Sequence, residues 1–388
     1  MKKFEAVDYF NINNLLSDEE KLVQESIREF VDSEIIPIIE ESYQDAKFPF
    51  EIVPKLAELG VFGMALPEKY GCAGMNNLAY GLVNQELERG DSGLRSFLSV
   101  QSSLVMYPIF AFGSEDQKMK WLPKLASAEM IGCFGLTEPD YGSNPGGMIS
   151  KAEKVDGGYV LNGAKMWITN GSIANIAIVW AKLDGVIKGF IIEKEFNGFS
   201  APEIKRKHSL RASITSELIF EDVFVPKENL LPESHGLKSP LMCLNQARYS
   251  IAWGVTGSMM ACYDAALEYS KSRIQFDKPI ASYQLTQDKL VNMLTEITKT
   301  QLLNFQLAKL KDAGEIKHTH ISLAKRNNVE KALEIARTAR EIFGASGITS
   351  EYPIMRHANN LESVKTYEGT HEMHTLIIGE DITGFNAF

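Results

Sequence analysis

The residues best suited to chemistry lie near the end of the chain, in the stretch TYEGTHEMHTLIIG at positions 366–379. Glu368 and Glu372 alternate there with His371 and His374, and such side chains can bind a metal ion or transfer protons. A third interpretation is a solvated helix start, because the helix dipole favours acidic residues at an N-terminus. The spacing and the surrounding elements have to separate these three interpretations.

The metal interpretation takes two forms. His371 and His374 are three residues apart, one short of the HExxH pattern that places two imidazoles on one helical face. Glu368 and His371 form a Glu-x-x-His pair, as in di-iron carboxylate bundles, and Glu315 with His318 forms a second one. A helix-ending Asp-Ala-Gly sequence directly precedes Glu315, so the second pair is expected in a solvated connection. We therefore predict no metal, with a di-iron bundle as the alternative from a different class.

Length and charge narrow the class of protein. A chain of 388 residues is too long for one compact core, so we expect two or three packed units. The net charge of -10 argues against nucleic acid as a partner, because an acidic surface gains nothing from it. No apolar run approaches the roughly 20 residues of a membrane span, and we expect no membrane insertion. Without a signal segment, we expect a cytoplasmic bacterial protein, or a mitochondrial matrix protein if the source is eukaryotic.

The first third of the chain has a helical period. Ser17 and Glu20 form a capping box, and the apolar stripe that follows predicts a helix ending near Pro37. Further helical patterns continue to residue 130, so we expect an N-terminal α-helical domain over residues 1–130.

The period changes twice more. Residues 131–238 alternate tight-turn dipeptides, among them Asn162-Gly163, with segments rich in β-branched and aromatic residues, which predicts a middle antiparallel β-barrel-like domain. Residues 239–388 return to a helical period and predict a C-terminal four-helix bundle. The fold class is therefore α+β, mostly α. Helices are expected over 240–272, 284–312 and 320–343, with a shorter one from about 370.

Several common motifs are missing. The chain has no GxGxxG after a strand, no GxxxxGK[ST] and no GxSxG, so any redox chemistry needs a different cofactor site. The four cysteines are far apart and show no CxxC spacing, so we expect small buried residues in a reducing compartment rather than a zinc site or disulfides. They are Cys72, Cys133, Cys243 and Cys262.

Four separated motifs give the chain a resemblance. TYEGTHEMHTLIIG, CFGLTEPDYGSN, MWITN and RIQFDKPI occur in an order that resembles the acyl-CoA dehydrogenase family over essentially the whole chain. The α, β, α order is also that family's architecture. Within the family, the likeness is to members that act on glutaryl-CoA. The segments similar to those members are 70–74, 86–106, 207–213, 245–255, 294–299 and 325–337.

The resemblance implies a reaction. The family removes an α proton and a β hydride from an acyl thioester, with FAD as the hydride acceptor, and Glu368 matches the catalytic base. The backbone N–H of that base and a ribityl hydroxyl of FAD bind the thioester carbonyl in the family. For glutaryl-CoA, oxidation and decarboxylation share the base and give crotonyl-CoA and CO2. Electrons are expected to pass to electron-transfer flavoprotein, in lysine and tryptophan degradation.

The resemblance also assigns cofactor contacts. Trp167 is expected to stack on the flavin, whereas without the resemblance it would equally suit the core of a β domain. Arg273 and Gln284 resemble residues that bind the FAD of a neighbouring subunit, which implies a homo-oligomer, a tetramer. The full set is Phe134, Gly135, Leu136, Thr137, Ser143, Trp167, Ile168, Thr169, Arg273, Gln284, Glu341, Ile342, Phe343, Gly344, Ala345, Thr370 and Glu372.

Substrate choice depends on Arg95. Its planar guanidinium can hold the distal carboxylate of a glutaryl chain, whereas a lone arginine is otherwise commonly exposed after a helix. Arg248 aligns with a residue that contacts CoA, and Gly369 lets the acyl chain pass close to the backbone. The expected substrate-binding residues are Glu88, Arg95, Ser96, Ser99, Ser143, Arg248, Tyr367 and Gly369.

Three positions depart from the family pattern. Ala345 stands where the family usually has a second glycine, Asn144 replaces an aspartate, and Leu94 stands where a tyrosine is expected. Three alternatives within the family stay open: a dehydrogenase or oxidase of another short acyl-CoA, a glutaryl-CoA dehydrogenase that does not decarboxylate, and a non-catalytic subunit.

Overall fold

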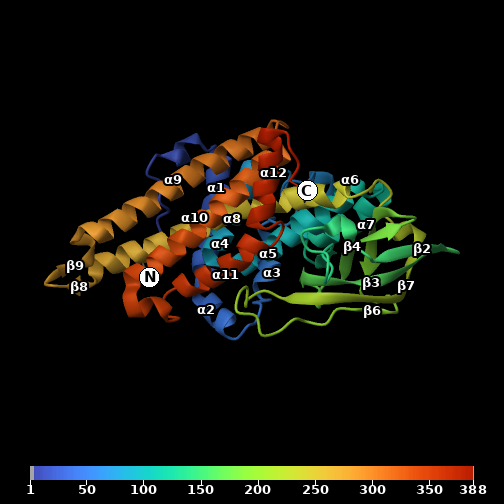
Figure 1. The fold of residues 1–388 in the computed structure, drawn as a ribbon, viewed down its shortest axis with the longest axis horizontal. Coiled ribbons are helices and arrows are strands. Elements are labelled where there is room, and N and C mark those ends of the chain that lie inside the picture. Colours follow the sequence, from blue (N-terminus) through green and yellow to red (C-terminus); the bar gives the residue numbers. More distant parts are fainter. Residues whose placement is uncertain (1–3, 388) are drawn as a thin grey trace.

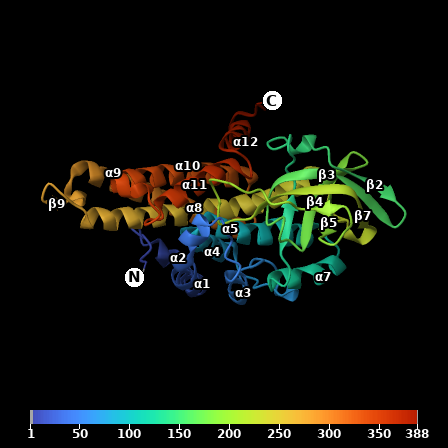
Figure 2. The same ribbon diagram turned by 90° about the horizontal axis from the view of Figure 1, so that it is seen from below.

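A computed structural model describes residues 4–387. Figure 1 shows a sheet domain at one end of an elongated molecule, with long helices running from it toward the small β8–β9 hairpin at the other end. Turned by 90°, the N-terminal helices form a layer beneath the long C-terminal helices (Figure 2). The predicted fold class, mostly α with helical, sheet and helical parts in that order, is confirmed.

The N-terminal helices follow their sequence signals closely. The Ser17 side chain accepts from the Glu20 N–H and the Glu20 side chain accepts from the Ser17 N–H, so the predicted capping box is present. The predicted helix end near Pro37 is wrong, because a π-helical turn leads on into the next helix. Pro37 lies in the first turn of that helix, where a missing N–H has no cost. The helices are α1 (Asp18–Phe30), α2 (Ile36–Gln44), α3 (Ile52–Glu58), α4 (Asn77–Gly90), α5 (Ser92–Ser99), α6 (Tyr107–Phe112) and α7 (Glu115–Ala126).

The middle part is one twisted sheet of mixed direction. Its strands run in the order β1-β4-β2-β3-β7-β6, with β5 paired to β4. The β1–β4 and β2–β4 pairs are parallel, so the expectation of a purely antiparallel unit is wrong in that detail. The strands are β1 (Gly132–Gly135), β2 (Lys151–Val155), β3 (Gly158–Thr169), β4 (Ile176–Leu183), β5 (Val186–Glu193), β6 (Phe199–Ser200) and β7 (Thr215–Pro226).

Asn162-Gly163 is not a turn, although its sequence is typical of one. Both residues lie inside β3, where the pairing with β7 shifts register between Leu161 and Gly163. Gly163 has a φ of 142° there, and a Cβ at that position would lie 2.3 Å from the Ser150 hydroxyl. The glycine therefore serves a close approach within the sheet.

The C-terminal helices match the predicted ranges almost residue for residue. Prediction missed α11, which is short and lies between two loops. The core has three clusters of buried apolar side chains: one joins the N-terminal helices to the sheet and the C-terminal helices, one lies among the C-terminal helices, and one lies within the sheet domain. The C-terminal elements are α8 (Lys238–Ser272), β8 (Ile274–Gln275), β9 (Lys278–Pro279), α9 (Gln284–Asp312), α10 (His318–Phe343), α11 (Ile354–Thr366) and α12 (His371–Thr383).

The domain limits 1–130, 131–238 and 239–388 stay a prediction, and residues 1–3 and 388 of the outer two lie outside the described residues. Within the described part of the chain, none of the helices is long and apolar enough to cross a membrane.

Candidate functional site

Glu368 lies in the short joint between α11 and α12. Thr370 is the N-cap of α12, and its hydroxyl accepts from the Met373 N–H at 3.2 Å, so the helix begins after Glu368. The Glu368 carboxyl is not a solvated helix start, because its Oε2 is buried and has no partner among the described residues. A carboxyl of this kind is available to a ligand that enters the site.

The joint has an unusual backbone. Glu368 has a φ of 53° and Gly369 a φ of 93°, so two successive residues adopt positive φ. For a glutamate this conformation is strained by about 1–3 kcal/mol and has to be held by its surroundings. A Cβ at Gly369 would lie 3.0 Å from His374 Nε2 and 3.1 Å from Arg248 Nη2, so a side chain there would be tight as well as strained.

Two buried cations bind the backbone of the joint. Lys325 on α10 donates to the carbonyl of Tyr367 and, at 2.6 Å, to that of Gly369. Arg248 on α8 donates through Nε to the carbonyl of Glu368 at 2.7 Å. Two helices that are distant in sequence therefore hold three successive carbonyls around the proposed base.

Burial changes the protonation of these groups. It raises the pKa of Glu368, although Lys325, Arg95 and Arg248 act in the opposite direction. It also lowers the pKa of Lys325, while the Glu368 carboxylate favours the ammonium form. His374 is buried beside both cations and has a strongly lowered pKa, so its ring is neutral. The carboxyl is thus a stronger base than an ordinary glutamate.

Arg95 is fully buried on α5, so the alternative of an exposed arginine is wrong. Its Nε donates to Glu88 on α4 at 2.6 Å, and its Nη2 donates to the Tyr367 hydroxyl. Burial acts to lower the pKa of Arg95, but Glu88, Tyr367 and Glu368 outweigh it and the pKa is raised. Gly254 on α8 makes room for the pair, because a Cβ there would lie 2.2 Å from Glu88 Oε2.

Two polar groups beside this pair are unsatisfied. Arg95 Nη1 and Ser99 Oγ are both buried without a partner in the described chain, and their i, i+4 spacing puts them on one face of α5. Ser96 is buried on the same helix. Because unpaired buried donors are costly, we infer that they await a polar ligand group.

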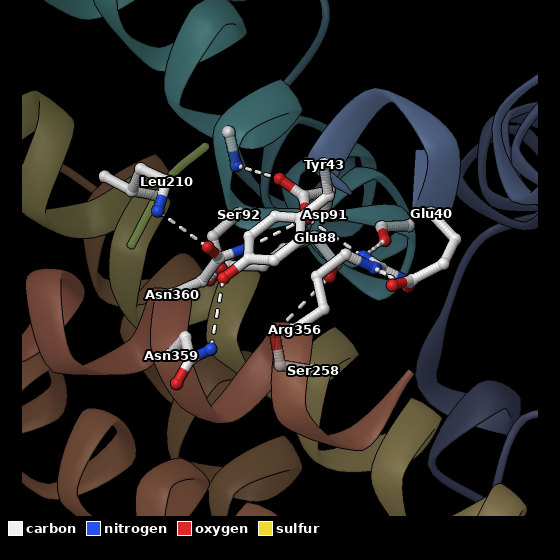
Figure 3. A network of polar contacts seen from close by, with 12 residues as sticks. Glu40, Tyr43, Glu88, Asp91, Ser92, Leu210, Ser258, Arg356, Asn359 and Asn360 are labelled. Atoms are coloured by element: carbon white, nitrogen blue, oxygen red, sulfur yellow. Dashed lines mark hydrogen bonds and ion pairs between the residues drawn. The ribbon is translucent and has the colours of Figure 1, made fainter. Parts of the chain in front are cut away.

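A polar network supports the α4–α5 joint (Figure 3). Asp91 caps α5 through the Gly93 N–H at 2.7 Å, and its other oxygen accepts from Arg356 at 2.9 Å and from Asn360 at 2.8 Å. Arg356 also donates to Glu40 on α2 at 2.9 Å. The helix that carries Arg95 is thereby tied to α2 and α11.

Trp167 provides a flat surface on the sheet side. It is 63% exposed, with a φ of 64° at the second register shift of β3, so the alternative of a core aromatic is wrong. The neighbouring Met166 N–H donates to the Thr137 carbonyl at 2.8 Å, which brings the end of β1 beside it. An exposed indole that is held in a strained backbone position can stack on a planar ring such as a flavin.

Other predicted flavin residues on the sheet present different surfaces. Phe134 and Leu136 are buried, and the Phe134 ring packs on Trp180 with 6.2 Å between centroids, so their backbone rather than their side chains is available. Gly135 lies within β1, and Ser143 is exposed in the loop that follows it. On β3, Ile168 is buried, and Thr169 ends the strand and pairs with Thr215.

The remaining predicted cofactor residues lie elsewhere in the chain. Thr370 caps α12 and Glu372 is exposed in its first turn. The others lie in or next to the β8–β9 hairpin and at the end of α10, on the side of the molecule away from the sheet domain (Figure 1). Arg273 and Gln284 are exposed, and Glu341 pairs with Lys289 at 2.7 Å. The rest stand at the end of α10 and are Ile342, Phe343, Gly344 and Ala345.

The second Glu-x-x-His pair has no metal-site geometry. Glu315 and His318 are exposed in and beside the link between α9 and α10, which confirms the expected solvated connection. Among residues 4–387, no group of three or more His, Cys, Asp or Glu side chains is placed to hold a metal ion. All four cysteines are free and buried, as predicted.

The predictions from sequence did not include Lys325 and Gly254, and they did not place His374 as a neutral buried neighbour of Glu368. Lys325 had a signal, since it lies on the apolar face of α10 with Ile321 and Val329. A lysine at such a position is rarely buried unless its charge is used. Gly254 gave a weaker signal, as a glycine inside a long helix.

Comparison with known proteins identifies relatives over nearly the full chain. Residues 17–129, 133–223 and 234–383 match the models of the N-terminal, middle and C-terminal domains of acyl-CoA dehydrogenases. The solved structure of a glutaryl-CoA dehydrogenase from Mycobacterium smegmatis is 54% identical, with a TM-score of 0.95 over 97% of both chains. A glutaryl-CoA dehydrogenase from the same organism, in complex with FADH2, is 50% identical, with a TM-score of 0.96 over 98% of both chains. A mitochondrial 2-methylacyl-CoA dehydrogenase of Solanum tuberosum is 36% identical over 381 residues, which cover 96% of this chain and 92% of the relative.

Proposed function

Because the chain belongs to the acyl-CoA dehydrogenase family, we propose that it oxidises glutaryl-CoA and decarboxylates it to crotonyl-CoA and CO2. The observation that carries the choice of substrate is the buried Arg95, with Nη1 and the nearby Ser99 hydroxyl unpaired. A plain fatty acyl chain offers no partner to these groups, whereas a distal carboxylate does.

The charges around the site favour an anionic substrate. Arg95, Arg248 and Lys325 all act on the Glu368 carboxyl, and Arg95 also pairs with Glu88, so three basic groups lie around these two carboxyls. With all five ionised, the excess is one positive charge. A glutaryl carboxylate would balance it, and the guanidinium fork of Arg95 can bind it through the free Nη1.

Glu368 acts as the base. Its buried carboxylate removes the α proton of the acyl thioester, and its raised pKa brings its strength closer to that task. Its backbone N–H donates to no protein oxygen within residues 4–387 and is free to bind the thioester carbonyl. That donor stabilises the charge which develops on the oxygen as the proton leaves.

FAD is the cofactor, and when bound it accepts the hydride from the β carbon. Trp167 would cover the flavin ring, and the backbone of residues 134–137 with Ser143 would line its edge. Arg273, Gln284 and residues 341–345 lie too far along the molecule to join this site in the same chain, so we propose that they bind the FAD of a neighbouring subunit in a tetramer.

Decarboxylation uses the same residue. After oxidation, the distal carboxylate lies one carbon beyond the new double bond, and its loss as CO2 leaves an electron pair delocalised toward the thioester. Protonated Glu368 returns its proton to the γ carbon and gives crotonyl-CoA. The two electrons removed from the substrate pass to electron-transfer flavoprotein.

Turnover with product identification tests this function. The FAD-loaded protein is incubated with glutaryl-CoA and an artificial electron acceptor, and the thioesters and CO2 are measured by mass spectrometry. We expect crotonyl-CoA and one CO2 for each two electrons transferred. Glu368→Gln is the control and should keep its flavin absorption while losing turnover by about 10³-fold or more.

Each other result points to a different activity. Accumulation of glutaconyl-CoA without CO2 would identify a dehydrogenase that does not decarboxylate. Turnover of butyryl-CoA or 2-methylbutyryl-CoA in preference to glutaryl-CoA would contradict the role of Arg95 and favour the specificity of the plant relative. A colourless protein that contains iron would exclude the flavin reaction.

A further inference from the structure

Lys325 is a buried charge that the reaction does not account for. It is 1% exposed on the apolar face of α10, between Ala324 and Asn328, which are also buried. Its ammonium donates to the carbonyls of Tyr367 and Gly369, the residues on either side of Glu368. Burying an ammonium costs several kcal/mol, so a purely structural role would be served better by an apolar residue.

The two hydrogen bonds constrain the base. The carbonyls of Tyr367 and Gly369 converge on one ammonium while the chain between them has positive φ. Arg248 binds the intervening carbonyl of Glu368 at 2.7 Å. With all three carbonyls bound, the peptide planes on both sides of Glu368 are restrained, and so is the direction of its Cα–Cβ bond.

The Lys325 ammonium also affects the Glu368 N–H, the donor proposed to bind the thioester oxygen. The Tyr367 carbonyl and the Glu368 N–H belong to one peptide unit, whose resonance couples the oxygen to the nitrogen. A cation on the oxygen draws electrons from the nitrogen and makes the N–H a stronger donor. No protein oxygen in the described chain accepts a hydrogen bond from this N–H.

We propose that Lys325 is a positioning residue for the base, which holds Glu368 in its strained backbone conformation and strengthens the Glu368 N–H as a donor to the thioester oxygen. This inference deepens the proposed function and rests on the assignment of Glu368, but it is independent of which acyl chain is bound. Lys325 acts through the backbone and touches neither the acyl group nor the cofactor in this assignment.

The charges around Glu368 come from several elements. Lys325 faces it from α10, Arg95 from α5 and Arg248 from α8, while Tyr367 precedes it and neutral His374 lies on α12. Among these groups, Lys325 contributes most to opposing the rise in the pKa of Glu368 that burial causes. Loss of its charge should therefore raise that pKa further, which a purely structural residue would not do.

Lys325→Met removes the charge and the two hydrogen bonds while nearly preserving volume. We expect kcat to fall at least tenfold with KM changed less than threefold. The acidic limb of the kcat profile should move to higher pH, because the carboxyl must lose its proton to act. The losses should be equal on glutaryl-CoA and butyryl-CoA, since Lys325 does not contact the distal carboxylate.

Lys311→Met is the matched control. Lys311 is a lysine near the end of α9 whose pKa burial lowers to about 8, and it donates to Gln246 without facing Glu368. Its loss should cost stability but leave kcat and the pH profile near wild type. The proposal is overturned if Lys325→Met and Lys311→Met show the same kcat and the same pH profile.

A spectroscopic readout separates this proposal from the proposed function. Isotope-edited infrared titration of the glutamate carboxyls, with Glu368→Gln to identify the band, reports the protonation of Glu368 without turnover. We expect the band to titrate at higher pH in Lys325→Met than in wild type, even if glutaryl-CoA is not the substrate. An unchanged titration would overturn the proposal while leaving Glu368 as the base.

Lys325→Arg serves if the methionine variant does not fold. It keeps the positive charge, so Glu368 should titrate as in wild type, while the larger guanidinium displaces the joint and lowers kcat. A titration moved to higher pH in this variant would contradict the role given to the charge.

Discussion

At the scale of single residues, the site consists of a few buried charged side chains, and some of their polar atoms have no partner in the described chain. Arg95 uses Nε and Nη2 on Glu88 and Tyr367 and leaves Nη1 unpaired. Arg89, in contrast, pairs with Glu86 and Asp32 and has no nitrogen that is buried without a partner in the described chain. The difference between these two buried arginines is a free donor in the first, and it points to substrate recognition rather than stability.

The first prediction concerns this free donor. Arg95→Met should reduce kcat/KM for glutaryl-CoA far more than for butyryl-CoA, by about 2–5 kcal/mol, because the substrate carboxylate would lose its charged partner. The measurement is the ratio of the two kcat/KM values. Arg89→Met is the control and should lower stability without changing that ratio. Equal losses on both substrates in Arg95→Met would make Arg95 a structural residue.

At the scale of elements, α11 positions the base. Arg356 of this helix donates to Asp91 and Glu40. Asn360 donates to the same aspartate, and its Oδ1 accepts from the Leu210 N–H (Figure 3). One helix therefore contacts both the N-terminal helices and the middle part of the chain. His357 is fully buried beside them, with neither ring nitrogen paired in the described chain. Its pKa is strongly lowered, first by burial and then by Arg356 and Arg89.

His357 predicts a loss of stability in mild acid. The folded state holds the ring neutral, while the unfolded chain protonates near pH 6.5, so this contribution is complete above pH 6.5 and is lost as the pH falls toward the lowered pKa. Between pH 6.5 and 5 the loss reaches at most about 2 kcal/mol per such histidine. His357→Leu should flatten the dependence of the urea midpoint on pH, leaving a part due to His374. His318→Gln, at an exposed histidine, is the control, and an unchanged slope in His357→Leu would contradict the argument.

At the scale of the whole molecule, the proposed cofactor residues fall into two groups that lie apart. Arg273 and Gln284 flank the β8–β9 hairpin, which lies at the opposite end of the molecule from the sheet domain, and residues 341–345 lie at the end of α10 (Figure 1). The same end exposes Phe276 at 88% and Leu285 at 81%. Large exposed apolar side chains beside charged ones are typical of an interface, so this end supports the proposed tetramer.

The proposed assembly makes FAD binding depend on the neighbouring subunit. Arg273→Ala should lower the flavin content of the purified protein at least tenfold at submicromolar concentration, because a charged contact to the cofactor is lost. Flavin absorbance per protein and light scattering after size exclusion measure it. Lys271→Ala, two residues away, removes an exposed lysine paired with Glu268 and should have no effect. A monomer that retains FAD in wild type would exclude this arrangement.

On its own, the sequence predicted most of the elements, and its resemblance to the family pointed to Glu368 as the base. Helix limits at Ser17, Asp312 and Phe343 follow from local caps and periods, whereas the residue types around Glu368 alone left a metal site, a base and a helix start as alternatives. Prediction failed at Pro37 and Asn162-Gly163, where a locally valid signal was overridden by packing, and it missed α11, whose neighbouring loops obscure its period.

Only the tertiary structure decided how the base is controlled. The contact of buried Arg95 with Tyr367 and the approach of Lys325 to the carbonyls around Glu368 both join residues tens to hundreds of positions apart, and the exposure of Trp167 is likewise decided by the folded sheet. A carboxyl's pKa and a guanidinium's free donor are set by desolvation and by neighbours in space, which a linear pattern does not contain. The sequence therefore proposes Glu368 as the base, while the packing of α5, α8 and α10 around it sets the charges that act on its carboxyl and leaves the free donor on which the proposed substrate depends.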